Sequence, residues 1–217
     1  MPKTSDTPGQ KGLPGRKAQA ARNDGIILEA ARAVFLADAG APISAVAERA
    51  GVGISALYRR YPSKDVLLRT LCYEGLRRYN AEAEAALEDP DGWRGLVGFL
   101  ERVVDADVHS LTVRLAGTFT PDDSIVPDVQ RSGELTTELV RRAHVTGRLR
   151  SDVTDLDLGL VLDACAAVTT PEPERTTQLR RRVLALLVDG LAGVGELPGP
   201  APQPGEFAWR WQPRTSG

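Results

Sequence analysis

The stretch Pro42–Lys64, with the sequence PISAVAERAGVGISALYRRYPSK, decides which fold we predict for this chain. In its first half, apolar residues recur at i, i+3, i+4 and i+7, the spacing of one helix face: Ile43, Val46, Ala47 and Ala50. Gly51 follows, and glycine readily takes the left-handed conformation that ends a helix. Helical spacing then restarts at once with Ile54, Leu57 and Tyr58. Two short helices joined by a tight turn indicate a helix-turn-helix.

On spacing alone, two interpretations of this helix pair are open. In the first, the pair reads DNA, because Ser55, Arg59 and Arg60 lie on faces other than the apolar one and offer hydroxyl and cationic groups. In the second, it is an ordinary corner of a helical bundle whose arginines form a solvated face. Only the sequence on either side of this stretch can decide between a DNA-binding pair and a corner of a helical bundle.

The charges of the 217-residue chain are unevenly distributed, although its net charge is only −2. Residues 1–69 contain 11 Lys and Arg against 6 Asp and Glu, a balance of +5. The remaining residues contain 16 against 23, a balance of −7. A basic front end on an acidic body is typical of a protein that contacts phosphate with one end only.

The composition predicts an all-α fold, since aromatic residues are few and Ala, Leu, Val, Arg and Glu are abundant. Cys72 and Cys165 lie in long helical patterns, so we expect buried free thiols rather than a disulfide. No apolar run approaches the roughly 18 residues of a membrane span. The first 20 residues also lack the apolar segment of a secretory signal. We therefore expect a cytoplasmic protein.

Four regions are predicted along the chain. They are a disordered basic arm over 1–21, a helix-turn-helix DNA-binding domain over 22–70, a helical regulatory and dimerisation domain over 71–196, and a Pro-rich tail over 197–217. The two tryptophans of the tail either pack back on the body or belong to a frayed terminus. We favour the frayed terminus.

Periodicity and capping residues place the helices. The first runs from about Asn23 to Ala39, with Asn23 or Asp24 as its cap. Ser63 caps a long helix that reaches about Leu87. Further helices are expected over about 93–109, 110–115, 127–146, 154–169 and 179–193, the fourth of them opened by a capping box of Thr154 and Asp157.

The last two helices are unusually apolar for surface elements. From Leu156 to Val168, only Asp157, Asp163 and small residues interrupt the apolar run. Two such helices per chain would form a four-helix interface with those of a second copy. The alternative is that both helices are buried inside one monomer.

The run from Asn23 to Leu71 resembles the DNA-binding domain of TetR-family transcriptional regulators. The matching stretches are ILEAARAVFLADAG (27–40) and AVAERAGVGISALYRRYPSKDVLL (45–68), and a later segment, GRLRSDVT (147–154), is like that of many members. Two features depart from the family pattern. Gly53-Ile54 opens the second helix of the motif where many members have serine and a polar residue, and Ala41-Pro42 replaces the usual Ser or Thr entry to the first.

The resemblance implies that the helix 54–60 lies in the major groove. It places Tyr58 and Tyr61 on phosphates through their hydroxyls, and Lys64, at a helix N-terminus, adds charge to that contact. Ser44 is expected near phosphate as well. Ser55, Arg59 and Arg60 are the candidates for reading bases, although each arginine could instead contact phosphate or be solvated.

The basic arm before the first helix adds a second possible contact with DNA. Arg16 and Arg22 belong to it, together with two lysines. Such an arm beside a helix-turn-helix often reaches phosphate or the minor groove. The alternative is a solvated tail.

The resemblance also implies a homodimer on a palindromic operator and a small-molecule pocket in the second domain. Ligand binding would tilt the fourth helix and change the spacing of the two recognition helices. A mostly apolar pocket suits a hydrophobic or aromatic compound. The candidate lining residues, for each of which ordinary packing is the alternative role, are Trp93, Phe99, His109, Arg114, Phe119 and His144.

We therefore predict a ligand-responsive repressor, with no cofactor and no metal. An enzyme is not favoured, because the two histidines are isolated and neither a Gly-rich phosphate loop nor a cluster of metal ligands is present. One alternative is a helical small-molecule-binding protein or enzyme whose helix-turn-helix is structural. Another is a non-specific architectural DNA binder, which would need basic charge over more of its surface.

Overall fold

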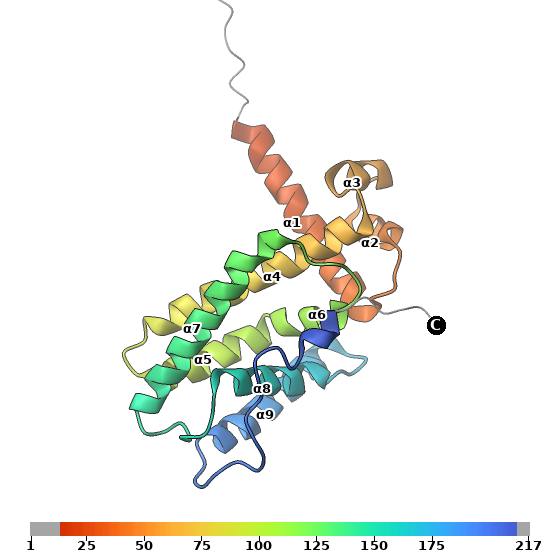
Figure 1. Cartoon of the computed structure of the whole chain (residues 1–217). Coiled ribbons are helices and arrows are strands. Elements are labelled where there is room, and N and C mark those ends of the chain that lie inside the picture. The colour runs from red at the N-terminus through yellow and green to blue at the C-terminus, as the bar shows by residue number, and fades with distance from the viewer. Residues whose placement is uncertain (1–13, 212–217) are drawn as a thin grey trace, which may run out of the picture.

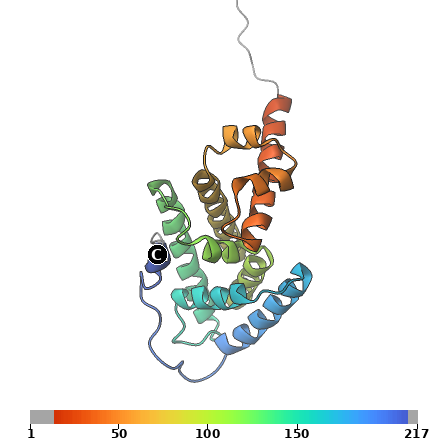
Figure 2. The same ribbon diagram turned by 90° about the vertical axis from the view of Figure 1, so that its right-hand side faces the viewer.

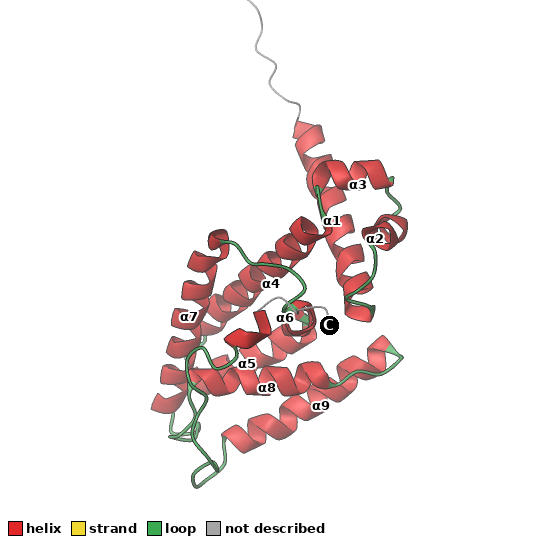
Figure 3. Cartoon of the chain, turned by 45° about the vertical axis from the view of Figure 1, so that its right-hand side comes forward, coloured by secondary structure: helices red, strands yellow, loops and turns green. Residues whose placement is uncertain are grey.

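The computed structural model describes residues 14–211, with side chains from Arg22 onward, and this part of the chain is all helical, as predicted (Figures 1 and 3). The elements are α1 (Pro14–Ala37), α2 (Ile43–Ala50), α3 (Ile54–Arg60), α4 (Lys64–Leu87), α5 (Gly92–Asp105), α6 (Val108–Leu115), η1 (Asp123–Ile125), α7 (Val126–Val145), α8 (Asp155–Ala167), α9 (Pro173–Leu191) and η2 (Ala208–Trp211). No helix in the described range is long and apolar enough to cross a membrane.

Helices α1 to α3 and the first turns of α4 form a small unit at one end of the molecule, which we call the head (Figure 1). Phe35, Val46 and Leu57 are completely buried in its core, one from each of the first three helices. The turn between α2 and α3 depends on Gly51, whose φ of 65° is left-handed and whose N–H bonds to carbonyls at the end of α2. The predicted helix-turn-helix is confirmed.

The rest of α4 and the helices α5 to α9 form the body. Its core consists of apolar side chains from every one of these helices except α6, and Leu96, Phe99 and Leu100 are fully buried in it. The start of α5 packs very closely on α7: a side chain at Gly92 would lie 2.3 Å from the Arg142 carbonyl oxygen. This contact leaves no room for any residue but glycine.

Helix α4 belongs to both units and connects them. Its 24 residues span about 36 Å at about 1.5 Å per residue. The side chain of Ser63 accepts a hydrogen bond from the Val66 N–H, so the predicted N-cap is confirmed. Helix α4 thus contributes side chains to the cores of both units.

Several predicted boundaries differ from the structure at the N-terminus. Helix α1 begins at Pro14 instead of Asn23, so the prediction of disorder is wrong for residues 14–21, and residues 1–13 lie outside the described range. Proline suits a first helical position, and the Ala, Gln, Lys and Arg residues that follow favour a helix even without apolar neighbours. Asp24 consequently lies inside α1 and caps nothing.

Other differences lie in the body. The break between α5 and α6 falls at Asp107, whose φ of 51° is left-handed, and not after His109. The predicted capping box of Thr154 and Asp157 is present, and Gly147 is left-handed just after α7. Pro173 opens α9, so this helix begins earlier than its apolar periodicity indicated.

The tail is more ordered than the frayed terminus that we favoured. Its described part runs from the end of α9 back along the body to η2 (Figure 2). There the Trp211 ring packs edge-on against Phe119, with 5.9 Å between ring centroids. The alternative in which a tail tryptophan packs back on the body is therefore the one observed.

Candidate DNA-binding face and internal cavity

The outer face of α3 presents polar groups to solvent. Tyr58 is 45% exposed, and Ser55 and Arg59 are also exposed. Among residues 22–211, none donates to or accepts from the Tyr58 hydroxyl or the Arg59 guanidinium. Leu57 on the opposite side is fully buried and fixes the helix to the head. The side chains that were predicted to contact DNA here are available to a partner.

Arg60, a third residue of this helix predicted to contact DNA, is already paired. Its guanidinium binds the carboxylate of Asp24 on α1 through two contacts, one of them 2.7 Å long between Nε and Oδ1. The arginine side chain is nevertheless 58% exposed. It can contact DNA only by sharing or leaving Asp24.

Tyr61 does not lie on the outer face. It is 5% exposed and belongs to the core of the head, and burial raises the pKa of its hydroxyl. The backbone leaves the helix at this residue, so the side chain turns inward. The phosphate contact predicted for the Tyr61 hydroxyl stays a prediction, and this residue exposes much less surface than Tyr58.

Lys64 is also committed within the head. Its ammonium group donates hydrogen bonds to the carbonyl oxygens of Ala39 and Ala41, at 3.2 and 2.7 Å, and lies over the Phe35 ring. The lysine thus fixes the connection between α1 and α2 to the start of α4. The phosphate contact predicted for Lys64 stays a prediction, and its ammonium group would have to share these partners to make it.

The remaining predicted DNA contacts lie at the edges of this face. Ser44 is exposed in the first turn of α2, and Arg22 is exposed on α1. Arg16 also belongs to α1, but its side chain lies outside the described residues. The arm is thus a continuation of the first helix over residues 14–21.

The body contains a cavity of about 470 Å³ between α4, α6, α7, α8 and the tail. Two of the six predicted ligand contacts, His109 and Phe119, line it. The other lining residues were not predicted: Cys72, Tyr73, Leu76, Tyr79, Val108, Thr112, Pro121, Ile125, Val129, Ser132, Gly159, Leu162 and Trp211.

The other four predicted ligand contacts lie elsewhere. Trp93 and Phe99 are buried in the core of the body, where the Phe99 ring packs in a T-shaped pair with Tyr79 of the cavity lining. Arg114 lines a separate groove between α1 and α9. The His144 Nε2 lies 3.0 Å from the Val153 carbonyl oxygen and holds the connection after α7.

Helix α6 faces the cavity on one side and the head on the other. His109 and Thr112 line the cavity, whereas Leu111 and Leu115 are buried in the core of the head. Helix α6 therefore contacts both the cavity and the core of the head.

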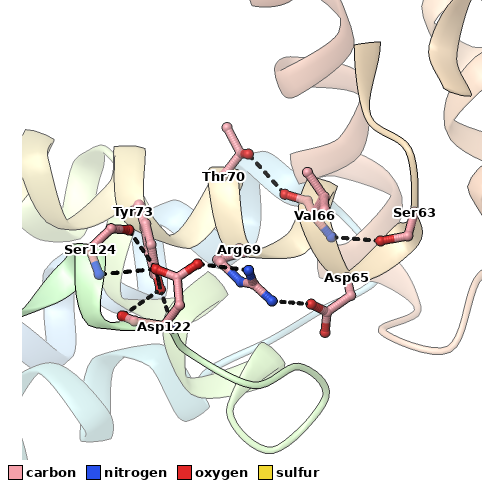
Figure 4. Close-up of polar contacts among 8 residues, drawn as sticks. All are labelled: Ser63, Asp65, Val66, Arg69, Thr70, Tyr73, Asp122 and Ser124. Carbon is pink, nitrogen blue, oxygen red and sulfur yellow. Dashed lines mark hydrogen bonds and ion pairs between the residues drawn. The ribbon is translucent and has the colours of Figure 1, made fainter. Parts of the chain in front are cut away.

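A polar cluster fixes the loop after α6 to α4 (Figure 4). Arg69 on α4 donates to the Asp122 carboxylate at 2.7 Å and also pairs with Asp65. The Tyr73 hydroxyl, at the cavity, accepts a hydrogen bond of 2.8 Å from the Asp122 N–H. Hydrogen bonds from Ser124, followed by those from Arg69, hold the pKa of Asp122 below its usual range although partial desolvation opposes them. The Asp122 carboxylate therefore stays ionised at lower pH than a free aspartate and keeps its ion pair with Arg69.

No group of three His, Cys, Asp or Glu side chains within the described part of the chain lies close enough to bind a metal ion. Cys72 and Cys165 are both buried free thiols, as expected, and burial raises the pKa of Cys72 to about 12. This cysteine lines the cavity but is a poor nucleophile at neutral pH. The cavity thus offers packing and hydrogen bonds.

Two family models match the chain. The model of bacterial regulatory proteins of the tetR family matches residues 27–71, and that of the C-terminal domain of SbtR-like transcriptional regulators matches residues 90–193. No curated protein sequence matches closely enough to count as a relative.

Solved structures share this fold. A TetR transcription regulatory protein from Mycobacterium vanbaalenii is 26% identical with a TM-score of 0.57, over 82% of this chain and 99% of its own. The regulator SCO0520 from Streptomyces coelicolor is 24% identical with a TM-score of 0.57, over 80% and 99%. The TetR-like regulator LfrR from Mycobacterium smegmatis, in complex with proflavine, is 23% identical with a TM-score of 0.59, over 82% and 99%.

Proposed function

We propose, from the premise that this chain belongs to the TetR family of transcriptional regulators, that it is a homodimeric repressor released from a palindromic operator by a small molecule. The observation that carries the proposal is the outer face of α3. Tyr58 and Arg59 project from a helix that is firmly packed on its other side, and neither has a partner among residues 22–211. Exposed, unpaired hydroxyl and guanidinium groups on a short rigid helix are suited to the major groove.

The two kinds of DNA contact fall to different residues. Tyr58 and Ser44 offer hydroxyls to phosphate, which fixes the position of the head on the duplex. Arg59 can donate two hydrogen bonds to guanine, which provides sequence preference. Arg60 adds a second cation if phosphate or a base replaces Asp24.

A second copy of the chain fits the outer surfaces of α8 and α9. Leu160 is 42% and Leu186 65% exposed, and the neighbouring Ala164, Ala167 and Ala185 are exposed too. Small and apolar residues on adjacent helices suit a four-helix interface between two copies. Replacing both leucines with glutamate should give monomers in analytical ultracentrifugation and weaken binding to a palindrome. An unchanged sedimentation coefficient would remove this face from the proposal.

The cavity is the proposed site of the effector. A ligand between α4, α6 and α7 would displace α6, whose other face packs in the head. It would also displace Tyr73, whose hydrogen bond with Asp122 joins the loop after α6 to α4. Both routes change the angle of the head on the body. The complex of LfrR with proflavine supports the general idea that this fold accommodates a small molecule.

The experiment is a gel-shift titration with the DNA upstream of the gene for this chain. The proposal predicts tighter binding to a palindromic segment than to the same bases in shuffled order. Arg141, 61% exposed on α7 and far from the head, provides a matched control: Arg141→Ala should leave binding unchanged, whereas Arg59→Ala weakens it. Equal affinity for palindrome and shuffled DNA would refute sequence-specific regulation and leave the architectural alternative.

A further inference from the structure

The last described residue of the tail, Trp211, lies at the cavity. Trp211 lines the cavity beside residues of α6, α7 and α8, and its ring packs edge-on against Phe119, at an angle of 75°. Trp209, two residues earlier, is 65% exposed and does not reach the cavity. The tail therefore places one particular aromatic ring where a ligand would pack.

The residue before this ring forms an ion pair at the cavity wall. The Arg210 guanidinium lies 2.7 Å from Oδ2 of Asp163 on α8, and Oδ1 of the same carboxylate lies 2.7 Å from His109 Nε2. Asp163 is one helical turn from Gly159, and both His109 and Gly159 line the cavity. The carboxylate is thus positioned directly behind the lining.

Asp163 is arranged to remain ionised in a partly buried place. Burial raises the pKa of this carboxyl group, but hydrogen bonds from His109 and Arg210 outweigh burial and leave the pKa below its usual range. Its side chain is only 20% exposed. A charge held away from water needs a compensating cation, and the lining of the cavity contains neither lysine nor arginine. The tail supplies that cation.

We propose that the tail is an internal competitor for the cavity, and that the ligand it competes with is an organic cation carrying an aromatic ring. Arg210 and Trp211 are adjacent in sequence and present those two groups together, the guanidinium to Asp163 and the ring to Phe119. A ligand with both groups would replace both contacts at once. The proposal rests on the proposed function, because it specifies the effector of the same cavity.

Competition has a quantitative consequence. While the tail occupies the cavity, the observed affinity for ligand is the intrinsic affinity reduced by the fraction of molecules with an open cavity. A variant whose tail cannot bind should therefore take up ligand more tightly. A tail that merely completed the ligand site would give the opposite result, because the variant would lose contacts to the ligand.

The test is a calorimetric titration of the full-length chain at pH 7.5 without DNA. The probes are 1-methylquinolinium, a two-ring cation, and quinoline, which has the same rings and is neutral at this pH. In the double variant Arg210→Gln, Trp211→Ala, the cation should bind about tenfold more tightly than in the unaltered chain, since about 1.4 kcal/mol of tail closure is removed. Val194→Ala, at a 96% exposed position in the segment after α9, is the control and should change neither affinity.

A further variant tests the charge. In the double variant background, Asp163→Asn should remove the advantage of 1-methylquinolinium over quinoline and leave quinoline binding unchanged. Circular dichroism establishes that each variant is folded, and the single substitution Arg210→Gln repeats the test with the smallest perturbation. Unchanged or weaker cation binding in the tail variants, or a cation preference that survives Asp163→Asn, would overturn the proposal.

The outcome is separable from that of the proposed function. The titration contains no DNA, so a chain without preference for a palindrome would refute the repressor and leave the tail result standing. Sequence-specific binding to a palindrome together with an unaffected titration would refute only the competing tail.

Discussion

The head and the body of this molecule hold their candidate functional groups in opposite ways. In the head, Ser55, Tyr58 and Arg59 lie within seven consecutive residues and face solvent. In the body, the cavity is lined by side chains from four helices, a loop and the tail. The difference teaches that a surface site can be encoded by one short stretch, whereas an internal site requires the whole fold. Each prediction below tests one side of this contrast or the connection between them.

The largest effect is expected at the contact that joins three segments near the head. Arg180 is 6% exposed and donates hydrogen bonds to the Asp107 carboxylate and the Val168 carbonyl oxygen, while the Asp107 carbonyl accepts from Arg32 of α1. Arg180→Ala removes both hydrogen bonds and leaves the half-buried Asp107 carboxylate without this cation, which should lower the free energy of unfolding by about 3 kcal/mol. Urea denaturation measures this change in the free energy of unfolding.

Arg175, exposed on the same helix, provides the control for that measurement. Among the described residues its guanidinium hydrogen-bonds only to Gln178, so Arg175→Ala should change stability little. Equal losses for the two variants would contradict a special role for Arg180.

In the head, the effect should appear in DNA binding and not in stability. Arg59→Ala removes an exposed guanidinium, so we expect a loss of about 1–3 kcal/mol in affinity for the preferred sequence and a relaxed preference at one position. Tyr58→Phe removes a phosphate contact and should weaken binding to all sequences alike. If both substitutions act uniformly across a panel of sequences, the assignment of Arg59 to base reading is wrong.

The connection between the two units is tested at Tyr73. Tyr73→Phe keeps the ring but removes the hydroxyl that accepts the Asp122 N–H, which should cost about 1 kcal/mol of stability. It should also reduce the extent to which a cavity ligand weakens DNA binding. Tyr79→Phe removes a hydroxyl at the same cavity that bonds to Thr136 instead, and should leave this coupling intact. Coupling lost equally in both variants would exclude the Tyr73 contact as the route.

A smaller effect of opposite sign is expected at Gly159. A side-chain carbon added there has no neighbour within 4 Å, so Gly159→Ala should stabilise α8 by up to about 1 kcal/mol, as should Gly133→Ala on α7. The larger Gly159→Leu should fill part of the cavity and abolish ligand binding, whereas Gly133→Leu should not. Thermal unfolding and ligand titration measure the two effects. Retained binding in Gly159→Leu would place the ligand elsewhere.

The smallest effect concerns the reactivity of Cys72. Its pKa is raised to about 12 by burial, so the folded state keeps the thiol proton up to a higher pH than the unfolded chain does. Stability is therefore unaffected below the unfolded pKa and falls as the pH rises above it. At pH 8 a thiol reagent should modify Cys72 only at the rate of unfolding. Rapid modification of Cys72 in the folded protein would show that this thiol is accessible from the cavity.

The parts of the head that could be predicted depend on local rules. The end of α2 at Gly51 and the cap of α4 at Ser63 could be predicted, because neither depends on residues distant in the sequence. Tyr61 and Lys64 belong to the same short stretch, yet their side chains are held by the core of the head and by the Ala39 and Ala41 carbonyls. Their orientation depends on partners that sequence spacing does not identify.

The cavity was predictable only in part for the same reason. His109 and Phe119 were identified as conspicuous residues of the middle helices, and both line the cavity. Tyr73 and Tyr79 were not identified, because apolar periodicity cannot separate a side chain that lines a cavity from one that fills a core. Trp211 provided one signal, an aromatic residue in a Pro-rich tail, but its position depends on Phe119.

The most direct test of the central claim, that the α3 face gives sequence-specific binding, is selection of bound sequences from a pool of random DNA by the full-length protein. We predict enrichment of an inverted repeat, with Arg59→Ala losing the preference at one symmetric pair of positions. A bound fraction with the same base composition and order as the starting pool would contradict the claim.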